Sequence, residues 1–187
     1  MDAPISLDAG PSGSLSNAEI SSLDAAPKII DASEIDASGT TGHGQQTARI
    51  AIKVLLDKQL GFHEPTPTER DALLVGFAMQ GQALPRSAFD MIRLSRPVNL
   101  SNPAEIAGNM DAVTIYEIKS TNRKNIKADL RGYFFNITGP ELLAAQALGA
   151  KFRFAFVNTL TRDYEEMTLT EVFARSRGMY PAYHIKF

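Results

Sequence analysis

The feature that most constrains how this chain can fold is the run of residues 112–120, which reads Ala-Val-Thr-Ile-Tyr-Glu-Ile-Lys-Ser. Its β-branched and aromatic side chains predict a β-strand. Side chains alternate between the two faces of a strand, so Glu117 and Lys119 share one face. A strand buried on both faces normally carries apolar side chains only. The charged pair therefore indicates either an exposed edge strand or a site with chemistry of its own.

A second carboxylate beside Glu117 would favour a metal site, because proteins hold Mg²⁺ with one or two carboxylates plus substrate phosphate oxygens. Asp111 precedes Glu117 by six residues without a turn residue between them, which places it roughly 20 Å away along an extended strand. Asp90 would lie beside Glu117 if residues 90–95 and 113–119 pair as an antiparallel hairpin. We therefore expect Asp90 in the site and keep Asp111 in reserve.

The rest of the folded region predicts interleaved helices and strands. One helix starts at an N-cap, Thr66 or Thr68, each followed three residues later by an acid. Residues 97–111 form a connection long enough to suggest a functional or mobile loop. Further helices are predicted at residues 46–60, 139–149 and 169–177, and strands at residues 89–94, 112–120, 132–138, 151–158 and 182–187. This alternation predicts a mixed α/β domain.

Charge and composition divide the chain into two parts. Residues 1–43 are rich in Ser, Ala and Asp and carry seven acids against Lys28 alone, a net charge of −6. The net charge of −2 for the whole chain leaves +4 for residues 44–187. We expect residues 1–43 to be a disordered acidic tail and residues 44–187 to be the α/β domain.

Two absences narrow the class of protein. The chain has no cysteine, which excludes a disulfide framework and a thiolate metal site and fits the cytoplasm. No run approaches the roughly 18 consecutive apolar residues of a membrane span, and the N-terminus lacks the pattern of a secretory signal. We expect a cytoplasmic protein without a membrane partner.

At this point the sequence resembles a known family. Asp90 on one strand followed by Glu117-Ile118-Lys119 on its partner resembles the PD-(D/E)XK, or restriction-endonuclease-like, superfamily of nucleases, over residues 66–158. Phe89 stands where the motif has proline, a position that varies widely in the superfamily. The resemblance implies a restriction-endonuclease-like core, with a central mixed β-sheet flanked by helices.

The chain is also similar to the branch of that superfamily that includes the C-terminal domain of plant NO VEIN proteins. The residues that carry this second likeness are the segments 116–121, 133–138 and 152–156, together with Glu141.

The resemblance implies a mechanism. Asp90, Glu117 and the backbone carbonyl of Ile118 would hold one Mg²⁺, for which Mn²⁺ could substitute, and Lys119 would orient or deprotonate the attacking water or neutralise developing charge. Glu69 is either an outer-sphere contact to the metal or simply the capping-box partner of an N-cap threonine. The implied activity is hydrolysis of DNA phosphodiester bonds by an endonuclease of the restriction, defence, repair or toxin type.

A polar and basic loop follows the charged strand and suits contacts with the phosphate backbone. Its predicted nucleic-acid-binding residues are Ser120, Asn122, Arg123, Lys124 and Lys127. DNA is thus the expected partner, and cutting both strands would favour a homodimer. Two alternatives stay open: a catalytically inactive relative that binds nucleic acid or a protein, and an unrelated α/β binding module in which Glu117 and Lys119 form a surface ion pair.

Overall fold

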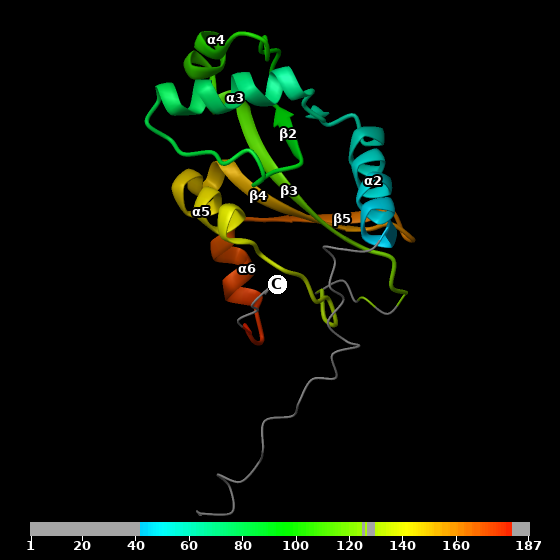
Figure 1. The fold of residues 1–187 in the computed structure, drawn as a ribbon. Coiled ribbons are helices and arrows are strands. Elements are labelled where there is room, and N and C mark those ends of the chain that lie inside the picture. Colours follow the sequence, from blue (N-terminus) through cyan, green and yellow to red (C-terminus); the bar gives the residue numbers. More distant parts are fainter. Residues whose placement is uncertain (1–41, 125, 127–129, 181–187) are drawn as a thin grey trace, which may run out of the picture. The chain divides into compact units, whose positions relative to one another are not determined.

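The computed structural model describes residues 42–124, 126 and 130–180. The predicted tail, up to residue 41, and the predicted strand at residues 182–187 lie outside them. The elements are α2 (Gly42–Asp57), β1 (Phe62–His63), α3 (Pro67–Met79), β2 (Met91–Leu94), α4 (Pro103–Gly108), the 3-10 turn η1 (Met110–Ala112), β3 (Val113–Thr121), α5 (Gly139–Leu148), the 3-10 turn η2 (Gly149–Lys151), β4 (Phe152–Asn158), β5 (Asp163–Met167) and α6 (Leu169–Arg175) (Figure 1).

The strands form one mixed sheet in the order β1-β2-β3-β4-β5. β3 and β4 run parallel, and the other neighbouring pairs are antiparallel. The predicted hairpin is confirmed, because Met91 pairs with Tyr116 and Leu94 pairs with Val113. The prediction of an α/β fold with a mixed sheet flanked by helices is confirmed.

The two faces of the sheet bury two separate apolar cores. Helices α3, α4, α5 and α6 cover one face, which we call the four-helix face, and α2 covers the other, which we call the α2 face (Figure 1). Side chains of β3 and β4 alternate between the two faces, as the strand period requires. The four-helix face receives Val113, Ile115, Phe152, Phe154 and Phe156, whereas the α2 face receives Tyr116, Ile118, Ala155 and Val157.

The start of α3 follows the predicted capping signal. Thr66 is the N-cap, its side chain accepts a hydrogen bond from the Glu69 backbone N–H, and Glu69 closes the capping box. The connection predicted as a long loop is partly ordered as α4 and η1. Asn102 caps α4 by accepting hydrogen bonds from the backbone N–H groups of Ala104 and Glu105.

The strand predicted at residues 132–138 is wrong, because those residues form no regular element. Their alternation is nevertheless real, since Tyr133, Phe135 and Ile137 pack against the core of the four-helix face. Strand pairing is not open to this segment at β3 or β4, because each of them already has a neighbour on both sides.

Two strands lacked a sequence signal. β1 spans only two residues, and β5 reads Asp-Tyr-Glu-Glu-Met, which is too acidic for a strand pattern. Both lie at the edges of the sheet, where short strands and charged side chains suit an edge open to water.

Gly61 lies in the turn after α2 and allows a close backbone approach. Its φ is +82°, and a Cβ there would lie 2.2 Å from the carbonyl oxygen of Leu94. The Leu94 N–H donates a hydrogen bond to the Gly61 carbonyl at 2.9 Å. The contact joins the turn after α2 to the end of β2.

We expect Gly61→Ala to lower the free energy of unfolding by about 2–4 kcal/mol, because it combines left-handed strain with a steric clash. The matched control is Gly81→Ala, where φ is +70° and a Cβ meets nothing within 4 Å, so only the backbone strain, about 1 kcal/mol, applies. Urea unfolding of both variants is the measurement. Equal losses would mean that the close approach at Leu94 is relieved without cost.

Candidate functional site

Asp90 lies where β2 begins, beside the charged end of β3. Its backbone N–H donates to the carbonyl oxygen of Tyr116 at 2.9 Å, and its Oδ2 accepts a hydrogen bond from the Ile118 N–H at 3.0 Å. The side chain therefore bonds to β3 where regular strand pairing stops. The hairpin register brings Asp90 opposite Glu117, since the next residue, Met91, pairs with Tyr116.

Glu117 and Lys119 are buried together. The Lys119 Nζ lies 2.9 Å from Glu117 Oε1, and each side chain is 11% exposed. β3 is an inner strand with β2 and β4 on its two sides. Glu117 and Lys119 therefore lie on an inner strand rather than an exposed edge strand, and their ion pair is buried rather than on the surface.

A third carboxylate completes the cluster. Lys119 Nζ also lies 2.7 Å from Glu141 Oε2, on the first turn of α5, and Glu141 is 5% exposed. Sequence reasoning did not include Glu141 among the site residues. A signal was present, because Thr138 followed by Glu141 is a capping-box pattern. That pattern predicts the start of a helix, but it does not predict contact with Lys119.

The electrostatics of the cluster are unbalanced. Burial raises the pKa of Glu117 to about 9, repulsion from Asp90 adds to the rise, and attraction to Lys119 only partly opposes it. Burial by itself lowers the pKa of Lys119, but attraction to Glu117 and Glu141 outweighs it and the net shift is upward. Lys119 thus remains an ammonium, while Glu117 ionises against two neighbouring carboxylates.

Arg70 of α3 is a further residue at this site that the sequence did not indicate. Its guanidinium donates hydrogen bonds to the carbonyl oxygens of Phe89 at 2.6 Å and Asp90 at 3.2 Å. It also lies over the Phe89 ring, 4.2 Å from the centroid. Arg70 therefore fixes the backbone that carries Asp90 into β2.

The two other acids that the sequence suggested for the site, Glu69 and Asp111, form contacts with other residues. Glu69 lies 3.0 Å from His63 Nε2 and accepts a hydrogen bond from the Thr66 N–H at 2.8 Å, so it is the capping-box partner. Asp111 lies in η1, forms an ion pair with Arg96, and has a side chain that is 70% exposed. The reserve role of Asp111 is wrong, because the β2–β3 register brings Asp90 to Glu117 instead.

The predicted basic loop leaves the carboxyl end of β3. Asn122, Arg123 and Lys124 are exposed, and the loop is tied to the end of β4 because the Asn158 side-chain amide donates to the Arg123 carbonyl at 3.2 Å. The other two predicted loop residues differ. Ser120 lies in β3 on the face opposite Lys119, and Lys127 is outside the described residues.

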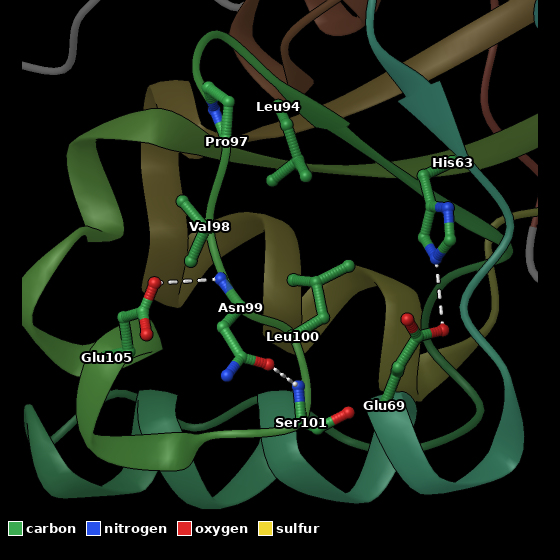
Figure 2. A pocket seen from close by; sticks show the side chains of 9 residues that line it. All are labelled: His63, Glu69, Leu94, Pro97, Val98, Asn99, Leu100, Ser101 and Glu105. Carbon is green, nitrogen blue, oxygen red and sulfur yellow. Dashed lines mark hydrogen bonds and ion pairs between the residues drawn. The ribbon is translucent and has the colours of Figure 1, made fainter.

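A separate open groove of about 560 Å³ lies at the other end of β2. Leu94, at that end, is four residues from Asp90, about 13 Å along a strand. Figure 2 shows three contacts between polar groups that line this groove: His63 with Glu69, Glu105 with the Asn99 N–H at 2.9 Å, and the Asn99 side-chain oxygen with the Ser101 N–H at 3.0 Å. The groove therefore does not belong to the carboxylate cluster. Its lining comprises His63, Glu69, Leu94, Pro97, Val98, Asn99, Leu100, Ser101 and Glu105.

Comparison with protein-family models, curated proteins and solved structures finds no match to this chain. Within the described residues, no three His, Asp or Glu side chains are grouped so that they could hold a metal ion. A Mg²⁺ site of two carboxylates and one carbonyl takes its remaining ligands from water and phosphate. Helices able to cross a membrane are also absent from the described part of the chain, since none is both long and apolar enough.

The raised pKa of Glu117 predicts a pH-dependent stability. Between its ordinary value of 4.5 and about 9, the folded state binds a proton that the unfolded state has released, so stability falls as pH rises through this window. Glu117→Gln removes that dependence. We expect the difference in free energy of unfolding, variant minus wild type, to become about 1–3 kcal/mol more favourable to the variant as the pH is raised from 5 to 8. Urea unfolding at each pH is the measurement.

Glu171→Gln is the control, because Glu171 is exposed and its pKa is lowered. Its loss of stability relative to the wild type should be the same at pH 5 and pH 8. A gap between Glu117→Gln and wild type that stays constant over this range would contradict the assigned ionisation of Glu117.

Proposed function

We propose that this chain is a Mg²⁺-dependent nuclease that hydrolyses DNA phosphodiester bonds, with Asp90, Glu117 and Lys119 as its catalytic residues. The observation that carries the proposal is that these three residues lie at one end of the β2–β3 hairpin, where the charge of Asp90 contributes to the raised pKa of Glu117. Asp90 bonds to the Ile118 N–H at 3.0 Å, and Lys119 bonds to Glu117 at 2.9 Å, all at the end of one hairpin. This is the arrangement that the resemblance to PD-(D/E)XK nucleases implies.

The donor set suits a divalent cation. Asp90 and Glu117 supply carboxylates, the hard oxygen ligands that Mg²⁺ prefers, and the Ile118 carbonyl is a third donor. Repulsion between the two carboxylates contributes to the raised pKa of Glu117, and a bound cation would relieve that repulsion. When bound, Mg²⁺ would supply Lewis-acid polarisation of the phosphate and a water ligand of lowered pKa.

Lys119 is the group that acts beside the metal ligands. Its raised pKa keeps the ammonium charged, which favours a role in neutralising charge on the phosphate over a role as a base. Asp90 and the hairpin backbone fix where the phosphate would lie relative to this ammonium. The proposed chemistry therefore depends on position and charge rather than on a covalent intermediate.

Exposed cations next to this cluster support nucleic acid as the substrate. Arg123 and Lys124 extend from the loop that leaves β3 two residues after Lys119, where they would contact the phosphate backbone of DNA. These contacts are independent of the catalytic residues. They would also serve the alternative function, a catalytically inactive module that binds nucleic acid. A homodimer would place two such sites on the two strands of a duplex.

We expect wild-type protein to cleave plasmid DNA with Mg²⁺ and to lose this activity with excess chelator. Lys119→Ala should lower the rate constant at least about 100-fold, because the charge that stabilises the transition state is lost. Asp111→Asn is the matched control and should cleave as wild type does, since the Asp111 carboxylate pairs with Arg96 on the surface. Equal cleavage by wild type and Lys119→Ala would exclude the proposed role of Lys119.

The binding function is tested without catalysis. In a background of Lys119→Ala, the double substitution Arg123→Ala and Lys124→Ala should weaken binding to a DNA duplex. It should also reduce the slope of log affinity against log salt by about 2, one for each lost phosphate contact. Fluorescence anisotropy at several salt concentrations is the measurement. An unchanged slope would mean that DNA does not contact this loop.

A further inference from the structure

The same capping motif begins α3, α5 and α6, but its glutamate has a different second partner each time. Glu69, Glu141 and Glu171 each accept a hydrogen bond from the backbone N–H of the N-cap threonine. Glu69 also pairs with His63, and Glu171 also accepts from the hydroxyl of its own N-cap threonine. Glu141 instead pairs with a lysine of the central sheet.

The contact at Glu141 joins the start of α5 to the reactive end of β3. One oxygen atom, Glu141 Oε2, accepts from the Thr138 N–H at 3.0 Å and from Lys119 Nζ at 2.7 Å. The helix behind it is anchored, because Ala144, Ala145 and Leu148 are buried in the core of the four-helix face. Glu141 is therefore held in place from two directions before it meets Lys119.

Lys119 is shared between two glutamates that have different tasks. Its other partner, Glu117, is a proposed ligand of the metal ion. A divalent cation on Glu117 repels the ammonium and takes up the carboxylate oxygens that Lys119 would otherwise contact. Glu141 is not one of the proposed metal ligands, so its contact with Lys119 is independent of that competition.

We propose that Glu141 is the positioning residue of Lys119, which it retains beside the reacting phosphate when a divalent cation occupies Glu117. The inference rests on the proposed nuclease function. In the cation-free protein Lys119 bridges Glu117 and Glu141. When a metal ion binds, Lys119 loses its contact with Glu117 and retains its contact with Glu141. The helix start thus serves both as a cap and as the anchor of the catalytic ammonium.

Kinetics of the variant Glu141→Gln test this role. The substitution keeps the capping box, because the residue three positions after the N-cap can be either glutamate or glutamine. We expect kcat to fall roughly 10- to 100-fold, as for other supporting contacts around metal sites, with KM unchanged. Glu171→Gln, the same substitution in the exposed box of α6, should leave both constants as in wild type. Adding Glu141→Gln to Lys119→Ala should cost nothing further, because the two residues act as one unit.

A spectroscopic readout separates this inference from the proposed function. In ¹H–¹⁵N spectra of lysine ammonium groups, a signal that Lys119→Ala removes should persist in wild type when Mg²⁺ is added and shift as the cation binds. In Glu141→Gln, Mg²⁺ should abolish that signal by releasing Lys119 to exchange with water. A signal that survives Mg²⁺ in Glu141→Gln would overturn the positioning role while leaving the nuclease proposal intact. A wild-type signal that does not respond to Mg²⁺, together with no cleavage, would overturn both.

Discussion

A buried lysine shared by two glutamates joins the central strand β3 to helix α5. Lys119, Glu117 and Glu141 lie on the four-helix face, the same face that buries Phe152, Phe154 and Phe156. Charges in such surroundings are retained only when they are paired and hydrogen-bonded. The cluster meets this condition by joining β3 to α5, so the position of that helix and the protonation of the cluster are linked. The apolar core continues on this face through Phe152 and Phe154.

Much of this arrangement follows from short-range rules in the sequence. The hairpin was predictable because residues 113–119 are extended without a turn residue, and extended geometry alone separates Asp111 from Glu117 and leaves Asp90 as the partner. Other features depend on information from distant parts of the chain. The segment 132–138 alternates like a strand but has no free strand to pair with, and the acidic β5 becomes a strand because β4 offers it an edge.

The candidate site also combines features that the local sequence indicates with contacts that it does not. Glu117 and Lys119 stand out as charges on an apolar strand, and the capping pattern at Glu141 is visible, but their meeting is not encoded locally. Lys119 and Glu141 are 22 residues apart, and their contact depends on how α5 crosses the sheet after an irregular segment. Arg70 is a similar case, since its contact with the Asp90 carbonyl spans 20 residues. Contacts between residues this far apart are seen only in the folded structure, because the sequence around one residue does not indicate which distant residue it will contact.

The polar network on the α2 face shows what a purely structural cluster looks like in this protein. Glu166 accepts a hydrogen bond from the Tyr116 hydroxyl at 2.7 Å and pairs with Arg93 at 2.6 Å, so one carboxylate meets one cation and one neutral donor. On the four-helix face, the ammonium of Lys119 pairs with Glu117 and Glu141. Arg70 hydrogen-bonds to backbone carbonyls, and its attraction to Asp90 and Glu117 partly offsets the burial that lowers its pKa. Both clusters lie on the same sheet and both contain paired charges, so the pairing of buried charges does not by itself distinguish them. What distinguishes the four-helix face is the repulsion between Asp90 and Glu117, which contributes to the raised pKa of Glu117 and which a divalent cation bound to both carboxylates would relieve.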